Sequence, residues 1–274
     1  LLDRSFGERW RDAPLTRVHG TTNLVLKLKL GRERFALRIP QLSDASFHVD
    51  RVSECAVVHA VHAAGLAPEV VACDAQTGIL VTRWIQTPPW SPAQTASPSR
   101  IRAIAAVVRK VHELAPPRQV RTLDLAGNLR SYCSTLTVQS PKLARDFASL
   151  NDRSNALLQH RTVTAPVLCH NDLNCRNIIG GGEVRLLDWE YSGLGEALFD
   201  LASYSQNHDL DKEARQLLLE AYGAAPAAMQ RFEVECQLFD WACVLWMALA
   251  GSATNAAERP RFERLVSRLR HAWG

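Results

Sequence analysis

A proline-rich break divides the sequence into two stretches that differ in hydrophobic pattern. Four residues in the range 86–99 are proline. Proline lacks a backbone N–H group and restricts the residue before it, so we expect no regular helix or strand in this range. Apolar residues alternate along the chain before the break and recur at helical spacing after it. The sequence therefore predicts two lobes, residues 1–85 and residues 86–274.

The alternation in the first stretch predicts a small antiparallel sheet. It indicates four strands, at residues 23–30, 34–39, 69–73 and 79–83. The first two strands are joined at Gly31 and read as a hairpin. Between the two pairs, residues 51–64 predict a helix, because apolar residues recur along them and Gly65 follows as a stop signal.

The second stretch is mostly helical in pattern. Helical spacing is clearest in four ranges, at residues 101–112, 211–222, 229–251 and 258–273. Residues 166–191 are an exception, because short apolar runs there flank three consecutive glycines. This range predicts a hairpin inserted in a helical lobe. The fold class predicted for the chain is thus α+β.

Composition excludes several other classes of protein. The chain has 274 residues, of which 47% are hydrophobic and 22% are charged, as in ordinary globular proteins and unlike disordered chains. Its longest apolar run, residues 241–251, is much shorter than the roughly 20 residues that cross a membrane. The first residues lack the basic-then-apolar order of a secretory signal. We therefore expect a cytoplasmic protein without a membrane span.

Charge and cysteine content narrow the partners further. The formal net charge is only +4 and is spread along the chain, which argues against binding to nucleic acid. The seven cysteines form no CxxC pair, so we expect reduced thiols and no structural zinc. The oligomeric state is left open by the sequence.

The predicted hairpin carries the residues that point to chemistry. His170, Asp172 and Asn177 form an HxDxxxxN pattern, and Asp188 follows eleven residues later. If the glycines of the hairpin form its turn, Asn177 and Asp188 lie together at its open end. An amide oxygen and a carboxylate are ligands that Mg²⁺ prefers, with waters and nucleotide phosphates completing its coordination. Asp172 then lies next to the metal and could accept the proton of a hydroxyl that attacks a phosphoryl group.

In this pattern the chain resembles the aminoglycoside phosphotransferase and choline kinase superfamily, over nearly its whole length. The resemblance implies a two-lobed protein-kinase-like fold with a small antiparallel-sheet N-lobe and a larger, mostly helical C-lobe. It also implies ATP and Mg²⁺ as cofactors, with Asp172 as catalytic base and both Asn177 and Asp188 as metal ligands. His170 is expected to brace the catalytic loop by hydrogen bonds rather than to react. Asp200 resembles the family aspartate that buttresses this loop.

The N-terminal stretch resembles the nucleotide site of the same fold. Ala36 and Arg38 share a strand face and are similar to the Ala-x-Lys strand of kinases, where the small residue underlies adenine and the cation pairs with phosphate. Arg in place of Lys is a departure, because a bidentate fork replaces a point charge. Glu54 matches the acidic helix residue that pairs with this cation.

Two further segments are expected to contact the nucleotide. Residues 19–23, including Thr22, fall where the phosphate-covering loop belongs, although they lack a GxGxxG motif. Residues 82–85, with Thr82 and Trp84, resemble the hinge whose backbone meets adenine.

The stretch DWEY at residues 188–191 is most similar to the choline, ethanolamine and thiamine kinase branch. Glu190 is a candidate to hold a cationic head group or a second metal, or to make a structural hydrogen bond. Trp246 is a candidate wall of a cation pocket, with a buried core tryptophan as the alternative. Trp241, five residues earlier, cannot line the same wall of one helix.

The predicted function is ATP- and Mg²⁺-dependent phosphorylation of a hydroxyl on a small cationic metabolite of the choline, ethanolamine or thiamine type. Asn171 replaces the Arg of a protein kinase HRD motif and no APE motif follows, which favours a small acceptor. The alternatives are an aminoglycoside, amino sugar or homoserine kinase. A catalytically silent nucleotide-binding scaffold is the alternative from another class.

Overall fold

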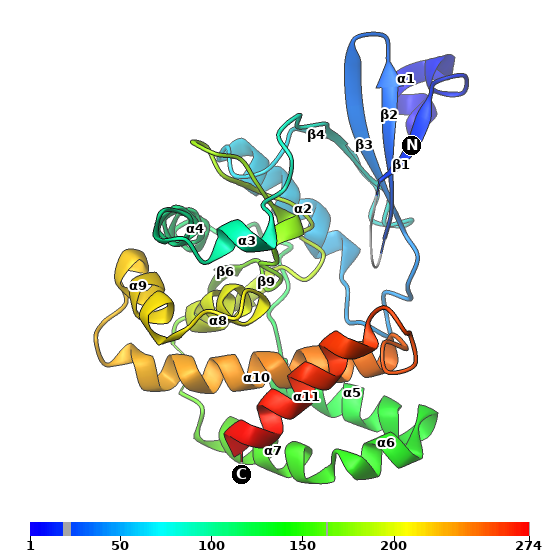
Figure 1. Cartoon of the computed structure of the whole chain (residues 1–274). Coiled ribbons are helices and arrows are strands. Elements are labelled where there is room, and N and C mark those ends of the chain that lie inside the picture. Colours follow the sequence, from blue (N-terminus) through cyan, green and yellow to red (C-terminus); the bar gives the residue numbers. More distant parts are fainter. Residues whose placement is uncertain (19–22, 163, 274) are drawn as a thin grey trace.

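The computed structural model describes residues 1–18, 23–162 and 164–273 (Figure 1). Its N-terminal part is a five-stranded antiparallel sheet in the order β1-β2-β3-β5-β4. The strands are β1 (Leu15–Val18), β2 (Asn23–Leu30), β3 (Glu33–Pro40), β4 (Val70–Cys73) and β5 (Leu80–Arg83). The four predicted strands are confirmed, while β1 was not predicted.

The two faces of the sheet have different environments. Phe35 and Leu37 of β3 are buried against Leu28, Val81 and Phe6. Phe6 ends α1 (Leu2–Phe6), which leads into the short helix η1 (Gly7–Trp10). Ala36 and Arg38 belong to the opposite face of β3 because side chains alternate along a strand. The alternation that predicted the hairpin thus also decides which of its residues face the site.

Helix α2 (Arg51–Ala63) follows the prediction closely. The side chain of Asp50 caps its first turn by accepting hydrogen bonds from the N–H groups of Val52 and Ser53, and Gly65 follows it with a positive φ of 74°. Cys55 of α2 and Cys73 of β4 form a disulfide. The prediction that the cysteines are all reduced is therefore wrong, because the fold places these two side chains within bonding distance although 18 residues separate them.

The proline-rich range contains more regular structure than predicted. Helix α3 (Pro92–Thr95) lies inside it, and α4 (Pro98–His112) begins before it ends. Both helices have proline in their first turn, where the missing N–H group has no helical partner to lose. The expectation of no regular helix was wrong because proline at this position is compatible with helix.

The C-terminal part is helical, as predicted, and lies below and to the left of the sheet in Figure 1. Its longest helix is α10 (Ala228–Leu249), on which Trp241 is fully buried against Phe147 and Trp273. The helices that follow α4 are α5 (Leu125–Gln139), α6 (Pro141–Asp146), α7 (Ala148–His160), α8 (Ala197–Asn207), α9 (Lys212–Tyr222), α10 (Ala228–Leu249) and α11 (Arg259–Trp273). No helix of the described residues has the length and apolar character needed to cross a membrane.

A hairpin interrupts the helices, also as predicted. Ile178 pairs with Leu186, and the N–H group of Leu187 donates to the carbonyl of Asn177 at 2.8 Å. Gly180 has a φ of 116°, and a Cβ atom there would lie 1.9 Å from the carbonyl oxygen of Glu183, so glycine is required. The short elements of this region are β6 (Val167–Cys169), η2 (Cys175–Asn177), β7 (Ile178–Ile179), β8 (Arg185–Leu186) and β9 (Gly193–Gly195).

Candidate active site

The loop after β6 holds the carboxylate of Asp172 between two amide side chains. Asn177 Nδ2 donates to Asp172 Oδ2 at 2.9 Å and to its backbone carbonyl at 3.0 Å. Asn174 Nδ2 lies 3.0 Å from both carboxylate oxygens. Burial raises the pKa of Asp172, although the hydrogen bond from Asn174 acts against that rise. The carboxylate is thus oriented by neutral donors and is more basic than usual.

His170 is fully buried and uses both ring nitrogens. Its Nδ1 accepts from the N–H group of Asp172 at 3.2 Å, so Nε2 carries the proton and donates to the carbonyl of Leu187 at 2.8 Å. The ring also lies against Trp189, with centroids 4.5 Å apart. One imidazole therefore ties Asp172 to the segment that leads into Asp188.

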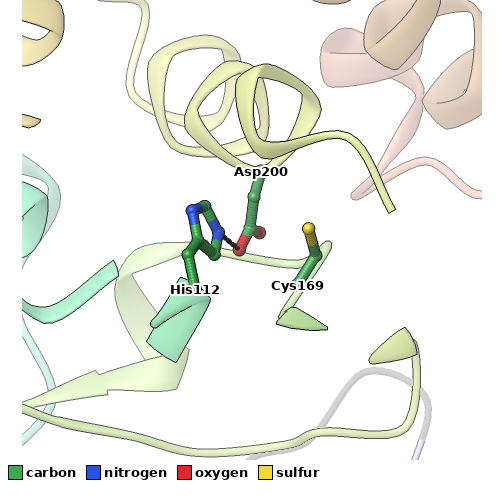
Figure 2. A group of neighbouring side chains, drawn as sticks. All are labelled: His112, Cys169 and Asp200. Carbon is green, nitrogen blue, oxygen red and sulfur yellow. Dashed lines mark hydrogen bonds and ion pairs between the residues drawn. The ribbon is translucent and has the colours of Figure 1, made fainter. Parts of the chain in front are cut away.

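A second set of hydrogen bonds, made by Asp200, fixes the start of the same loop. Figure 2 shows the contact of Asp200 with His112. The carboxylate of Asp200, on α8, accepts hydrogen bonds from the backbone N–H groups of His170 at 2.9 Å and Asn171 at 2.7 Å. His112 Nε2 lies 3.1 Å from Asp200 Oδ2. The other ring nitrogen of His112 lies 2.7 Å from the hydroxyl of Tyr222. Burial alone would raise the pKa of Asp200, but the hydrogen bond and charge of His112 bring it below the usual range.

Cys169 lies beside His112 and Asp200, and the three offer ligand atoms within 4.8 Å of one another, close enough for a metal ion. Both nitrogens of His112 and both oxygens of Asp200 already make hydrogen bonds. We therefore assign the group to bracing the loop, where Asn171 adopts a strained φ of 66°.

Asp188 follows the return strand of the hairpin and has a φ of 60°. Its side chain is 26% exposed, and Oδ1 accepts from Arg38 Nη1 at 2.9 Å. Its charge also raises the pKa of Asp172. In the described structure the Asn177 side chain makes two hydrogen bonds, and its amide nitrogen donates both. Its carbonyl oxygen can therefore act as a ligand of a metal ion. These oxygens form a hard donor set of the kind that Mg²⁺ prefers.

Arg38 joins the sheet to α2 and to the hairpin. Its guanidinium makes a bidentate ion pair with Glu54, in which Nη2 lies 2.8 Å from Oε2, and it also contacts Asp188. Glu190 Oε2 lies 4.0 Å from Arg38 Nη1. All four side chains lie close together although they come from β3, α2 and the segment after β8.

Arg51 is a second buried cation in this cluster. Its Nη1 contacts Glu54 at 2.8 Å and Glu190 at 3.1 Å. Asn23 Nδ2 also donates to Glu190, at 3.1 Å. Burial and the charge of Asp188 raise the pKa of Glu190 to about 7, against the pull of the two arginines. Asn23 ends the predicted phosphate-covering segment, but its contact with Glu190 was not predicted. Arg51 was not predicted, because no local motif identifies it.

The remaining nucleotide candidates lie along the sheet. Ala36 pairs with Thr82 across β3 and β5, on the face that carries Arg38. Trp84 follows β5. Its backbone N–H group donates to the carbonyl of Arg34, and the centroid of its ring lies 4.6 Å from Lys27 Nζ. Thr22 lies outside the described residues.

Trp246 of α10 lies near the end of the DWEY stretch. Its Nε1 donates to the hydroxyl of Tyr191 at 2.9 Å, and its ring centroid lies 5.3 Å from that of Phe47. It is partly exposed, in contrast to the fully buried Trp241. Tyr191 was not singled out from the sequence, although its place directly after Glu190 was a usable signal.

Comparison with known proteins gives consistent matches. Residues 15–233 match the phosphotransferase enzyme family. Protein LicA of Haemophilus influenzae is 28% identical over 218 residues, 76% of this chain and 62% of that protein. Ethanolamine kinase 2 of Rattus norvegicus is 30% identical over 165 residues, 57% of this chain and 42% of that protein. The chain thus aligns with less than two thirds of the length of these relatives.

Solved structures share the fold. A choline/ethanolamine kinase family protein from Mesorhizobium loti is 26% identical with a TM-score of 0.74, covering 93% of this chain and 88% of that one. Choline kinase LicA from Streptococcus pneumoniae has a TM-score of 0.83 at 18% identity, and the match covers 98% of this chain and 96% of that one. A LicA structure in complex with AMP has a TM-score of 0.80 at 18% identity, and the match covers 96% of this chain and 93% of that one. The predicted two-lobed kinase-like fold is confirmed by these likenesses.

Proposed function

The chain belongs to the phosphotransferase enzyme family, and we propose that it transfers the γ-phosphoryl group of ATP to the hydroxyl of a small cationic alcohol. Its family makes it a small-molecule kinase of the choline/ethanolamine kinase-like kind. The observation that carries the finer proposal is the position of Asp172. Its carboxylate accepts hydrogen bonds from Asn174 and Asn177, and it lies close enough to Asp188 for the charge of Asp188 to raise its pKa.

Asp172 acts as the base in this proposal. Its carboxylate accepts the proton of the acceptor hydroxyl as the oxygen attacks the phosphoryl group, and its raised pKa favours that role. His170 and Asp200 hold the loop and are positioning residues. Positioning and neutralisation of charge supply most of the rate in such a transfer.

Asn177 and Asp188 would hold Mg²⁺, because their oxygens form a hard donor set at one end of the hairpin. When bound, the metal neutralises charge on the transferred phosphate. Arg38, whose guanidinium is oriented by Glu54, would pair with a phosphate oxygen of the nucleotide.

We assign donor binding to residues 1–85 and acceptor binding to residues 86–274. The nucleotide lies along the face of the sheet that carries Ala36, Arg38 and Thr82, with its base near Trp84. The phosphate-covering role of residues 19–23 stays a prediction, because residues 19–22 lie outside the described residues. The AMP-bound LicA structure supports an adenine nucleotide as donor.

The acceptor's cationic group is assigned to Glu190, Tyr191 and Trp246. The charge of Glu190 acts on Tyr191, whose hydroxyl accepts a hydrogen bond from Trp246. A carboxylate attracts an ammonium or thiazolium nitrogen by its charge, and an aromatic face attracts it by a cation–π interaction. The names of the relatives favour choline or ethanolamine, and the same chemistry also suits thiamine.

The test is ADP release from ATP by the purified protein, with and without Mg²⁺, across choline, ethanolamine, thiamine, homoserine, an amino sugar and kanamycin. We expect turnover with one of the first three, dependent on Mg²⁺ and lost in Asp172→Ala. Turnover only with kanamycin, the amino sugar or homoserine would favour the other acceptor classes. Tight ATP binding without turnover on any acceptor would favour a silent scaffold.

A further inference from the structure

The disulfide joins α2 to the sheet beside the residues that hold Arg38. Cys55 follows Glu54 on α2, and Cys73 ends β4. Leu80 of β5 pairs with Cys73 on one side and with Arg38 of β3 on the other. Because residues directly opposite one another in a sheet share a face, Cys73 and Arg38 lie on the same face, two strands apart. The disulfide therefore fastens α2 to the row of the sheet that carries Arg38.

The two elements that the disulfide joins also supply two partners of the Arg38 guanidinium. From α2, Glu54 makes the bidentate ion pair. From the turn between β4 and β5, the carbonyl of Gly78 accepts from Arg38 Nη2 at 3.3 Å. A Cβ atom at Gly78 would lie 2.7 Å from Pro40 Cγ and 2.8 Å from Arg51 Nε, so this turn packs closely against the cluster. A shift of α2 relative to β4 would therefore change how the guanidinium is oriented.

Among the seven cysteines, all within the described residues, this pair is the one that a reductant changes. Cys55 and Cys73 are half-buried, and the five other cysteines are already free thiols. In the reaction with a dithiol, a thiolate of the reductant attacks one disulfide sulfur and the bond between the two cysteines breaks. Two electrons and two protons pass to the protein as the reductant closes its own disulfide. The product has two thiols in place of the covalent tie between α2 and β4.

We propose that the Cys55–Cys73 disulfide is a redox-sensitive positioning element, which holds α2 and the β4–β5 turn around Arg38 so that its guanidinium is placed for the phosphates of the nucleotide. The proposal rests on the proposed function in one respect, the assignment of Arg38 to these phosphates. In the reduced protein α2 shifts relative to β4. Asp188 and Glu190 then compete with the phosphates for a guanidinium that α2 no longer fixes. The oxidised protein is the form with the higher affinity for ATP.

The first experiment measures the binding of ATP and of adenosine to the full chain, both oxidised and after treatment with dithiothreitol. Thiol counts of five and seven in the unfolded protein identify the two forms. We expect reduction to raise the Kd for ATP roughly tenfold, as when one hydrogen bond to a charged group is disturbed. The Kd for adenosine, which has no phosphate, should stay unchanged. An unchanged Kd for ATP in protein with seven thiols, or an equal rise for adenosine, would overturn the proposal.

Two variants separate positioning from stability. The double variant Cys55→Ser/Cys73→Ser should bind ATP as weakly as the reduced protein and should not respond to dithiothreitol. Val61→Ala is the matched control, because Val61 is a fully buried core residue of the same helix, two turns beyond Glu54. It should lose stability but keep both the ATP affinity of the oxidised wild type and the response to reductant. Equal weakening of ATP binding in Val61→Ala would mean that lost stability accounts for the effect, and would reject the positioning role.

Glu54→Gln tests whether the disulfide acts through the contact of α2 with Arg38. This change keeps the shape of the side chain and removes its charge, so the Kd for ATP should already be raised and should respond less to dithiothreitol than in the wild type. A full response in Glu54→Gln would contradict the positioning of Arg38 by α2.

Two outcomes separate the redox device from the proposed function. Tight binding of ATP that is equal in the two redox forms would leave the proposed function standing and reject the device. Absence of ATP binding in both forms would reject both. With an acceptor that is turned over, steady-state kinetics give a further readout, because reduction should raise the KM for ATP and leave the KM for the acceptor unchanged. A rise in the KM for the acceptor alone would contradict a role at the phosphates.

Discussion

The catalytic loop and the cluster of arginines and carboxylates differ in how they are held. The loop around Asp172 is fixed by hydrogen bonds that neutral amide side chains donate to its carboxylate and that backbone N–H groups donate to His170 and Asp200, nearly all within the helical part. The cluster around Arg38 is held by ion pairs between segments that lie 16 to 150 residues apart. The loop is therefore fixed by its own lobe, whereas the cluster depends on how the two lobes meet.

The charge of the two regions differs as well. Four carboxylates, those of Asp44, Glu54, Asp188 and Glu190, share two guanidinium groups in the cluster. An excess of carboxylates over guanidinium groups, two of them buried, favours the binding of cations such as Mg²⁺ or an ammonium group. The loop carries one oriented base and little excess charge. The difference predicts that changes in the loop affect rate, while changes in the cluster affect both stability and binding.

The largest effect is expected in the loop. Asp172→Asn removes the base but keeps the shape of the side chain, so kcat should fall by about 10²- to 10⁴-fold. The free energy of unfolding and the affinity for ATP should stay near wild type, because Asp172 forms no ion pair in the described structure. Steady-state kinetics and urea unfolding check both parts. Asp152→Asn, an exposed site on α7, is the control. A kcat within tenfold of wild type would rule out Asp172 as the base.

The cluster should respond in the opposite way. Arg38→Met leaves Glu54 and Glu190 buried without this partner, so the protein without ligands should lose about 3–5 kcal/mol of unfolding free energy. Adding Glu54→Gln should recover part of the loss, because it removes one of the buried carboxylates that would then share Arg51 as their cation. Urea unfolding of the two single variants and the double variant gives the coupling energy. A loss below about 1 kcal/mol for Arg38→Met would contradict a stabilising role.

The disulfide belongs to the cluster side of the comparison, since Cys55 follows Glu54 on α2. The double variant Cys55→Ser/Cys73→Ser should lose about 3 kcal/mol of unfolding free energy, as expected for a disulfide between residues 18 positions apart. A reductant should destabilise the wild type by a similar amount and leave the double variant unchanged, which thermal unfolding would reveal. Equal sensitivity of both proteins to reductant would show that the disulfide does not account for the difference.

The smallest effect concerns acid stability on the loop side. His208 Nε2 donates to the carbonyl of Leu173 at 3.1 Å, and burial lowers its pKa from 6.5 to about 4. The stability that the neutral ring contributes is fully present above pH 6.5 and is lost as the pH falls towards 4. Between pH 7 and pH 5 the loss is about 2 kcal/mol. His208→Gln keeps a donor without titrating, so its unfolding free energy should vary less with pH. Identical pH profiles of the two proteins would refute the assignment.

The sequence predicted the parts of the molecule that depend on local pattern. Alternation along 23–30 and 34–39 gave the central hairpin of the sheet, and the glycines after Ile179 gave the hairpin of the site. Asn177 meets Asp172 because only a short loop separates them. Each of these contacts joins residues that are close in sequence, so their spacing was sufficient to predict it.

Contacts between distant segments could not be predicted in this way. Arg51 reaches Glu190 across 139 residues, and Asn23 reaches it across 167. The disulfide of Cys55 depends on how α2 lies against β4, and the place of Phe47 depends on the route of residues 41–49 between β3 and α2. Each follows from the packing of whole elements, which no spacing rule specifies.

The central claim is the transfer of phosphate to an alcohol with Asp172 as base, and ³¹P nuclear magnetic resonance of the reaction mixture tests it most directly. With ATP, Mg²⁺ and choline, ethanolamine or thiamine, the account predicts one phosphoester of the acceptor for each ADP formed, and no such signal from Asp172→Asn. ADP appearing only with free inorganic phosphate, or an equal phosphoester signal from the variant, would contradict it.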